Sequence, residues 1–426
     1  MTIPTTCFRL RVVSALILVA FCLTACRTAP NSALDQTSLH ERATAAVRAE
    51  ETHLIAFRHD LHRYPELSGQ EQRTSAKIAE QLVNLGYEVR ANVGGYGVVG
   101  ILRANLAEKQ RGPTIAFRAD MDASRDASVD PVPYASKVAG VRHNCGHDVH
   151  STIGVGLAIG FASVRDALTG DVVLIFQPAE ESGTGADAML ADSAMDDIHP
   201  DAILAVHTFP LEVGELATTA GALIAGRARI AVTLTGDGDL SAAADQVHAA
   251  LINVSTVTGA EALQPMDPGF IYVELAQPRT HPVDQVAFVS GLVMSTGIAG
   301  RAAVRESVLR AINGIELEGI EIQIEYGQAL EGVNNDAETV RRAWNGISTL
   351  TPELRVQQFP KVFPAFSEDF GSFQRTIPGV MFFVGVNNPA AGTVGFPHSP
   401  DYVADDGAIL VGVEAMLAAS FALMDP

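Results

Sequence analysis

Apolar residues along the chain gather into two kinds of segment that alternate. Short, continuously apolar segments are typical of the buried strands of a parallel sheet, and longer segments with a helical period indicate amphipathic helices. Strands are predicted at 87–93, 98–102, 114–119, 171–176, 202–206 and 380–384. Helices are predicted at 39–61, 68–85, 151–161 and 405–422. This alternation predicts an α/β domain built on a mostly parallel sheet.

A segment of different texture interrupts this pattern between residues 226 and 333. Its apolar positions predict a strand, a helix, two strands, a helix and a strand, at 230–235, 241–252, 270–275, 285–294, 301–312 and 321–326. That order is typical of the ferredoxin-like split βαβ arrangement. We therefore expect an α+β domain, 226–333, inserted into a larger domain formed by 38–225 and 334–426.

The N-terminus predicts an export signal rather than part of the fold. Two arginines precede an apolar run, 12–23, which is too short to span a bilayer comfortably because about 20 apolar residues are needed. The run ends in Leu-Thr-Ala-Cys, which resembles the bacterial lipobox and makes Cys26 the lipidation site. We expect a lipoprotein signal peptide at 1–25, a tether at 26–37, and a lipid anchor to a cell-envelope membrane, facing the periplasm or the exterior. An ordinary signal peptide is the alternative.

Composition and charge narrow the classes of partner. Hydrophobic residues make up 47% of the chain and charged residues 18%, as in an ordinary globular protein. About 400 residues beyond the signal exceed what one hydrophobic core usually organises, in agreement with two domains. The formal charge of −20 predicts an acidic surface, which argues against nucleic acid or an anionic lipid face as a partner.

The strongest chemical signal is the segment 143–150, His-Asn-Cys-Gly-His-Asp-Val-His. Three of the four cysteines fall in or at the end of the export signal: Cys7, Cys22 and Cys26. Cys145 therefore has no disulfide partner in the mature chain, and a thiolate among imidazoles suits a first-row transition metal. Further carboxylate and imidazole groups follow predicted strands at 177–181 and 205–207. The pattern predicts a metal-dependent hydrolase, although an isolated cysteine is more often a small buried hydrophobe.

Seven short motifs, in order over nearly the whole mature chain, resemble those of the M20 metallopeptidase family. They are Asp60-Leu61-His62 with Pro65-Glu66-Leu67-Ser68, Arg118-Ala119-Asp120-Met121-Asp122-Ala123, Cys145-Gly146-His147-Asp148 with His150, Gln177-Pro178-Ala179-Glu180-Glu181, Ala205-Val206-His207 with Pro210, Ser367-Glu368-Asp369-Phe370, and Phe396-Pro397-His398-Ser399-Pro400. The resemblance is to the amidohydrolase branch, whose members hydrolyse N-acyl amino acids such as hippurate and indole-acetyl amino acids. It implies that the inserted domain acts as a lid and as a possible homodimer surface.

The resemblance also implies roles for single residues. The implied ligands of zinc or manganese, often bound as a pair of ions, are Cys145, His147, Glu181, His207 and His398. Glu180 is the implied general base, and Asp122 the implied carboxylate that orients a ligand imidazole. Adjacent side chains at a strand end point in opposite directions, so Glu180 and Glu181 can divide the roles of base and ligand. Outside such a motif, adjacent glutamates are usually a solvated face.

The inserted segment departs from the family pattern. Leu240 stands where the family motif Gly-x-Gly-Gly-His has its histidine, and by spacing His281 and Met294 replace an Asn and an Arg that hold the substrate carboxylate. Leu and Met cannot donate charge-assisted hydrogen bonds. Either the alignment slips here, or the substrate lacks a free carboxylate, or hydrolysis is impaired. His281 could partly substitute as a substrate-binding residue, with a nearby arginine: Arg227, Arg229 or Arg279.

Two classes of function therefore stay open. An amidohydrolase of altered specificity is favoured, because all five ligand positions and Glu180 are intact. A dipeptidase or carboxypeptidase of the same family is the second choice within the enzyme class. A metal-containing protein that binds small peptides or acyl amino acids without catalysis is the alternative, and the altered lid is its main support.

Overall fold

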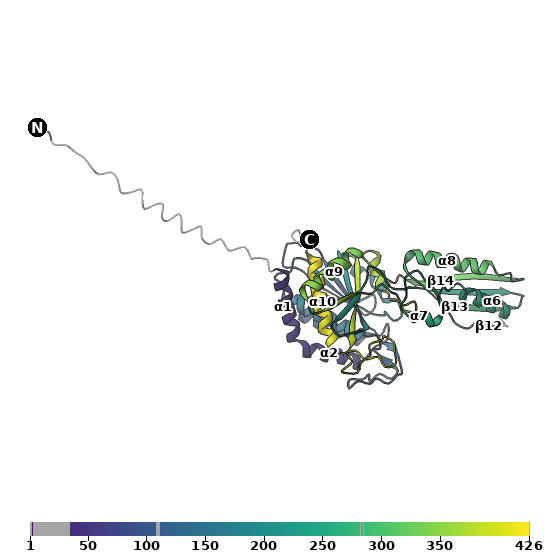
Figure 1. Cartoon of the computed structure of the whole chain (residues 1–426), viewed down its shortest axis with the longest axis horizontal. Coiled ribbons are helices and arrows are strands. Elements are labelled where there is room, and N and C mark those ends of the chain that lie inside the picture. The colour runs from purple at the N-terminus through teal and green to yellow at the C-terminus, as the bar shows by residue number, and fades with distance from the viewer. Residues whose placement is uncertain (1, 3–34, 108–110, 282, 284, 426) are drawn as a thin grey trace. The chain divides into compact units, whose positions relative to one another are not determined.

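A mixed sheet of eight strands forms the centre of the larger part of the fold (Figure 1). The structure is a computed structural model, and it describes residues 2, 35–107, 111–281, 283 and 285–425. In spatial order the strands are β1 (Glu88–Val93), β2 (Gly97–Leu102), β6 (Val172–Gln177), β3 (Ile115–Asp120), β7 (Ala202–Glu212), β17 (Gly379–Asn387), β8 (Glu215–Thr218) and β16 (Arg355–Gln358). β6, β3, β7 and β17 run parallel to one another, as do β8 and β16. The predicted signal peptide, most of the tether and Cys26 lie outside the described residues.

Helices pack against this sheet and bury both of its faces. One face packs against α1 (Gln36–Ala49), α2 (Glu51–Arg63), α3 (Gln72–Asn84), α4 (His147–Ser163), α9 (Ala337–Leu350) and α10 (Gly407–Met424), several of which Figure 1 labels. The other face packs against α5 (Gly185–Leu190) and short segments near the C-terminus of the chain. Because both faces are covered, every residue of β2, β3 and β6 is buried, and this explains why their sequences are mostly apolar. The predicted α/β class with a mostly parallel sheet is confirmed.

The structure corrects the predicted elements in two places. The helix predicted at 39–61 is two helices that meet at Glu50, where α1 packs on α10 and α4 while α2 packs on α4. Second, β7 does not end before His207 but runs on to Glu212, because its parallel pairing with β17 continues through Phe209. His207 therefore projects from within a strand rather than from the loop after it.

A second, antiparallel sheet is formed by the inserted segment. Its strand order is β11 (Ile271–Leu275), β13 (Val286–Ser295), β10 (Gly226–Gly236) and β14 (Ile320–Leu330), with β12 (Arg279–His281) also paired to β13. α6 (Leu240–Ile252) and α8 (Gly297–Asn313) pack on one another and share an apolar core with these strands. The predicted strands and helices are present in the predicted order, and β12 and a short helix, α7 (Gly259–Ala262), are additional. The role of the inserted segment as a lid or a dimer surface stays a prediction.

Short two-stranded ribbons complete the connections. β9 (Gly221–Ile224) pairs with β15 (Val333–Asn335), where the chain passes into and out of the second sheet, and β4 (Ser124–Arg125) pairs with β5 (Val141–Arg142).

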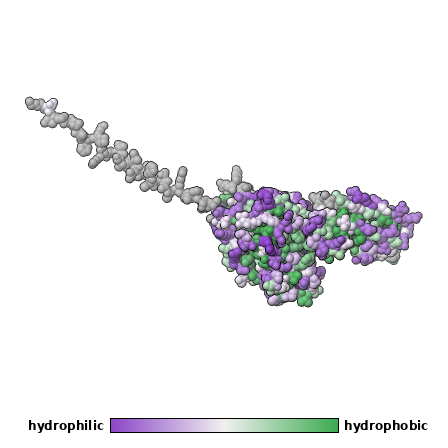
Figure 2. Space-filling model, viewed as in Figure 1, coloured by the Kyte–Doolittle hydropathy of each residue, from purple (hydrophilic) through white to green (hydrophobic). Residues whose placement is uncertain are grey.

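Among the described residues, α10 is long and apolar enough to cross a membrane, but 78% of it is buried inside the protein, as in a core helix. Polar residues are spread over the face shown in Figure 2, with apolar residues scattered among them.

Candidate metal centre

The ends of parallel strands and the start of one helix bring the predicted site residues together. Asp122 follows β3, Glu180 and Glu181 follow β6, and His207 lies in β7. α4 begins at His147. Ligand sites of open α/β sheets lie beyond the carboxyl ends of the strands, where this cluster is found.

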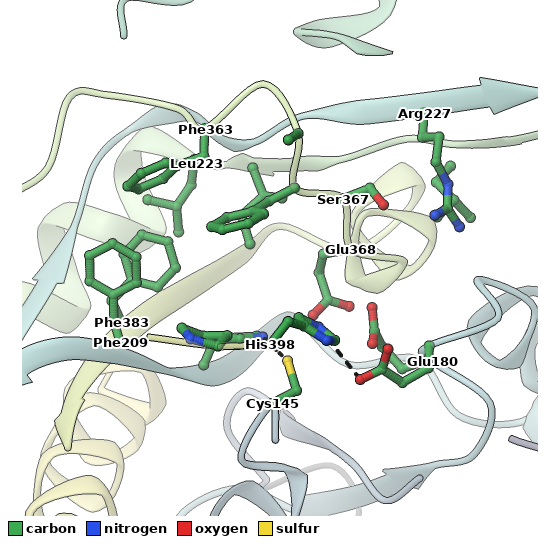
Figure 3. Close-up of a pocket in the computed structure, with 17 residues that line it drawn as sticks. Cys145, Glu180, Phe209, Leu223, Arg227, Phe363, Ser367, Glu368, Phe383 and His398 are labelled. Carbon is green, nitrogen blue, oxygen red and sulfur yellow. Dashed lines mark hydrogen bonds and ion pairs between the residues drawn. The ribbon is translucent and has the colours of Figure 1, made fainter. Parts of the chain in front are cut away.

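The donor atoms of the five predicted ligands form overlapping groups. In one group, Cys145, His147 and His207, and in another, Cys145, Glu181 and His398, all donor atoms lie within 4.8 Å of one another. Cys145 Sγ is 3.4 Å from His207 Nε2, and His398 Nε2 is 3.6 Å from Glu181 Oε1 (Figure 3). His398 adopts φ 61°, a left-handed conformation that is uncommon for a residue with a side chain and is found preferentially at functional sites. The structure thus brings together residues that lie far apart in the sequence.

Hydrogen bonds determine which ring nitrogens are free. His207 Nδ1 lies 2.8 Å from the carbonyl oxygen of Thr208 and donates to it, so Nε2 carries the lone pair that faces Cys145. His150, in contrast, has both nitrogens occupied: Nδ1 lies 2.7 Å from Asp120 Oδ1, and Nε2 accepts from the Thr208 N–H at 2.8 Å. His150 therefore supports β7 beside His207 and has no lone pair left for a metal.

Three buried nitrogen and oxygen atoms of the predicted ligands have no hydrogen-bond partner among the described residues. They are His147 Nδ1, His147 Nε2 and Glu181 Oε1, and both residues belong to the donor groups. Buried polar atoms are normally satisfied, so each unpaired atom needs an explanation. Together with the thiol of Cys145 they form a nitrogen, oxygen and sulfur set of the kind that binds zinc and other first-row metals. The residues present fit a divalent metal.

The protonation of the acidic groups points the same way. Burial raises the pKa of Glu180 well above its ordinary value, and the neighbouring Glu368 carboxylate adds to the shift. Burial also raises the pKa of Glu181 to about 7 and raises the pKa of the Cys145 thiol. These shifts disfavour the anionic forms, first because burial removes the groups from water and second because the acidic groups face one another. A divalent cation would supply the positive charge that such a cluster needs.

Asp122 holds several parts of the site at once. Its carboxylate accepts from the backbone N–H groups of Glu180, at 3.1 Å, and Glu181, at 3.0 Å, and from the Ser68 hydroxyl at 2.6 Å. Asp122 Oδ1 also lies 3.3 Å from His147 Nδ1. Carboxylates behind a metal site commonly fix ligand imidazoles, and the orienting role of Asp122 stays a prediction.

A buried ion network for which no role was predicted lies beneath the glutamates. Arg118 donates from Nε to Gln177 Oε1 at 2.8 Å, from Nη1 to Asp120 at 2.7 Å, and from Nη2 to Glu368 at 2.9 Å and Asp369 at 3.0 Å. The sequence signal was an arginine inside the buried strand β3, two residues before Asp120. Its other partners, Gln177, Glu368 and Asp369, come from distant segments, which local spacing cannot identify.

The donor groups lie beside a cavity of about 240 Å³. One side of the cavity is apolar and largely aromatic, formed by Phe209, Leu223, Ile224, Phe363, Phe366 and Phe383. Acidic residues and one arginine, Arg227, also line it. Figure 3 shows the labelled phenylalanines on one side of the view and Arg227 on the other, with Cys145 and His398 below.

The three altered positions of the inserted segment do not line this cavity in the described chain. Leu240 begins α6 and packs in the apolar core of the second sheet. Met294 is 1% exposed and packs in a separate apolar cluster with Ala225. His281 is exposed on β12, with its ring edge-on to Phe288. Substrate binding by His281 stays a prediction.

Comparisons with known proteins give these motifs a family. The probable hydrolase sll0100 of Synechocystis is 31% identical over 388 residues, covering 86% of this chain and 95% of that protein. N-acetyldiaminopimelate deacetylase of Geobacillus thermodenitrificans is 31% identical over 345 residues, covering 79% and 89% of the two chains. The crystal structure of Bacillus subtilis YXEP protein, described as a dinuclear metal binding peptidase from the M20 family, matches with a TM-score of 0.74 and 27% identity, over 89% of this chain and 99% of that one.

The family signature itself covers most of the fold. Residues 116–421, from β3 through nearly all of α10, match the family described as peptidase family M20/M25/M40. The match includes all five predicted ligands and Glu180. The chain therefore belongs to peptidase family M20/M25/M40.

Proposed function

We propose that this protein hydrolyses an amide bond in a small N-acyl amino acid or peptide-like substrate, with one or two divalent ions, zinc or manganese, in the site. The proposed ligands are Cys145, His147, Glu181, His207 and His398. The observation that carries the proposal is that these side chains, from four separate segments, turn their donor atoms toward one another, with Glu180 beside them. Relatives described as a hydrolase, a deacetylase and a dinuclear metal binding peptidase support the reaction class and the metal.

In this proposal Glu180 is the general base. Its buried carboxylate lines the cavity, with Oε2 3.7 Å from His147 Nε2, and Asp122 holds its backbone. A bound divalent ion would polarise the carbonyl group of the scissile amide. Glu180 accepts a proton from the attacking water and donates it to the leaving nitrogen, so that a C–O bond forms, the C–N bond breaks, and an acid and an amine are released.

The second candidate is a dipeptidase or carboxypeptidase with the same site. Thermostable carboxypeptidase 1 of Saccharolobus solfataricus is 30% identical over 404 residues, covering 90% of this chain and 99% of that protein, which favours this candidate. Binding without catalysis is the third candidate. The buried Glu180 favours catalysis over binding alone, because a purely binding site has no need of a proton acceptor beside the ligand cluster.

A substrate screen with controlled metal content tests the proposal. N-acyl amino acids, dipeptides and their carboxamides would be incubated with the full-length mature protein after chelation, and again after zinc or manganese is restored. We expect hydrolysis of acyl amino acids that chelation abolishes and the metal restores. Faster hydrolysis of dipeptides would favour the second candidate, and binding without turnover of any compound would favour the third.

For localisation we propose a lipid anchor at Cys26 that holds the enzyme at a bacterial cell-envelope membrane. The support is the sequence of the export signal alone, since these residues lie outside the described ones. An anchor through lipid chains, with no spanning segment required, leaves the acidic catalytic part in the aqueous phase.

A further inference from the structure

Arg227 lines the site, and its cationic side chain has no hydrogen-bond or ion-pair partner among the described residues. It lies in β10, two residues after Ala225, whose backbone forms a bridge with Ser367. Its side chain is partly buried, lines the cavity together with Ser367 and Glu180, and points into the cavity (Figure 3). The backbone of Arg227 pairs within the sheet, but no hydrogen bond or ion pair joins its side chain to another residue that the structure describes. Arg118, by contrast, is fully used by its carboxylate and amide partners.

A partly buried guanidinium without a partner is an energetic cost unless an anion binds it. Burial lowers the pKa of Arg227 while the Glu180 carboxylate opposes that shift, and a guanidinium remains charged at neutral pH. The other charged groups in the cavity lining are acidic, namely Glu180, Glu181 and Glu368. An anionic substrate group would be repelled by these carboxylates, so its place in the cavity is beside Arg227.

We propose that Arg227 binds the α-carboxylate of the substrate. This inference rests on the proposed function, and it defines the substrates as N-acyl amino acids with a free carboxylic acid. The planar guanidinium matches a carboxylate through two parallel hydrogen bonds. The positions that the family resemblance implied for this task hold a buried Met294 and an exposed His281, neither of which lines the cavity among the described residues. Arg227 supplies the charge that those positions lack.

The geometry also assigns the two ends of the substrate. The aromatic side of the cavity and Arg227 lie on different sides of the view in Figure 3, with the metal-donor residues Cys145 and His398 below them. The scissile amide must lie near the donor residues, so the acyl group extends toward the phenylalanines and the amino acid toward Arg227. An apolar acyl group, and in particular an aromatic one, fits the side that contains Phe209, Phe363 and Phe383.

One other role for Arg227 predicts a different kinetic result. The resemblance places Leu240 where the family motif has a histidine, and a guanidinium in the cavity could stabilise negative charge on the reacting carbonyl oxygen. Stabilisation at the reacting oxygen acts in the transition state for every substrate. A carboxylate anchor acts only when the substrate has the carboxylate. A substrate pair that differs in this group alone therefore separates the two roles.

The experiment uses N-benzoylglycine and N-benzoylglycinamide and measures benzoate release by the metal-loaded wild type, Arg227→Ala and Arg229→Ala. Arg229 lies in the same strand, is exposed and is outside the cavity lining, so it controls for the loss of one positive charge. Arg227→Ala should lower kcat/KM for the acid roughly tenfold to a hundredfold, mainly through KM, and change the amide less than about threefold. Arg227→Lys should recover part of the loss, and Arg229→Ala should resemble the wild type.

Binding measurements keep this inference separate from the proposed function. With zinc-loaded Glu180→Gln protein, calorimetry should show tighter binding of the acid than of the amide, and Glu180→Gln/Arg227→Ala should lose that difference, even if neither compound is hydrolysed by the wild type. An equal loss of kcat/KM for both compounds would overturn the carboxylate role. So would a Glu180→Gln protein that binds the acid no more tightly than the amide, including one that binds neither.

Discussion

At the scale of single residues, Asp122 is the group on which most of the site geometry depends. An Asn at this position keeps the shape, but its NH₂ group cannot accept the N–H of Glu181 or the Ser68 hydroxyl proton. Asp122→Asn should lower metal affinity or kcat/KM roughly tenfold to a hundredfold, as removal of orienting carboxylates commonly does. Chelator competition and steady-state kinetics on the same preparation measure the two effects.

Asp171→Asn is the matched control for that prediction. Asp171 is a buried carboxylate paired with Arg103 and Arg111, and it precedes the first residue of β6, at the opposite end of the strand from the site. Asp171→Asn should lower the free energy of unfolding without a specific loss of metal. If the Asp171 variant lost as much metal affinity as the Asp122 variant, the effect would be general destabilisation and not the orientation of ligands.

Residues within one local motif could be predicted from the sequence, whereas partners brought from far away could not. Cys145 and His147 are two positions apart, so their spacing alone indicated a metal site. Arg118 meets Glu368 across 250 positions of sequence, and no local pattern records that contact. Arg227 was one of three arginines that the sequence offered in place of a missing family residue, and the cavity distinguishes it from Arg229.

At the scale of the elements, the start of α4 depends on a glycine. Gly146 has φ 90°, and a Cβ there would lie 2.3 Å from Tyr402 Oη and 2.4 Å from Thr208 Oγ1, closer than atoms can pack. Gly146→Ala combines backbone strain with this overlap, and we expect it to destabilise the fold by about 2–4 kcal/mol. Because α4 begins at His147, metal content should fall as well. Urea unfolding measures the first effect and elemental analysis the second.

Gly140→Ala separates the cost of backbone strain from the cost of overlap between the new Cβ and its neighbours. Gly140 has φ 71°, but a Cβ there would meet nothing within 4 Å. This variant should cost only about 1–2 kcal/mol, the strain of a left-handed residue. Equal unfolding free energies for the Gly140 and Gly146 variants would show that the contacts with Tyr402 and Thr208 relax without cost.

Which elements form was predictable, but where some of them end was not. The periodicity of 39–61 is helical throughout, and no glycine or proline marks the break at Glu50, after which the chain changes direction so that both α1 and α2 pack on α4. The end of β7 is set by pairing with β17, a strand more than 160 residues later in the sequence. Tertiary packing decides both boundaries, and a local pattern does not contain that information.

At the scale of the whole molecule, the proposed lipid anchor determines where the enzyme acts. Cys26→Ser removes the thiol that accepts the lipid chains, and without those chains the proposed anchor is lost. We expect the variant to move from the membrane fraction to the soluble fraction, with the activity of the wild type, when cells are fractionated. A variant that is still processed and still sediments with membranes would contradict the anchor.

The central claim, metal-dependent hydrolysis with Glu180 as the base, is tested most directly by metal content and turnover measured side by side for Glu180→Gln. The amide cannot accept a proton from water but leaves the five proposed ligands in place, so the account predicts wild-type metal content and turnover lowered at least about a hundredfold. Cys145→Ala, which removes a proposed ligand, should instead lose metal and activity together. Near-wild-type turnover by metal-loaded Glu180→Gln would contradict the account.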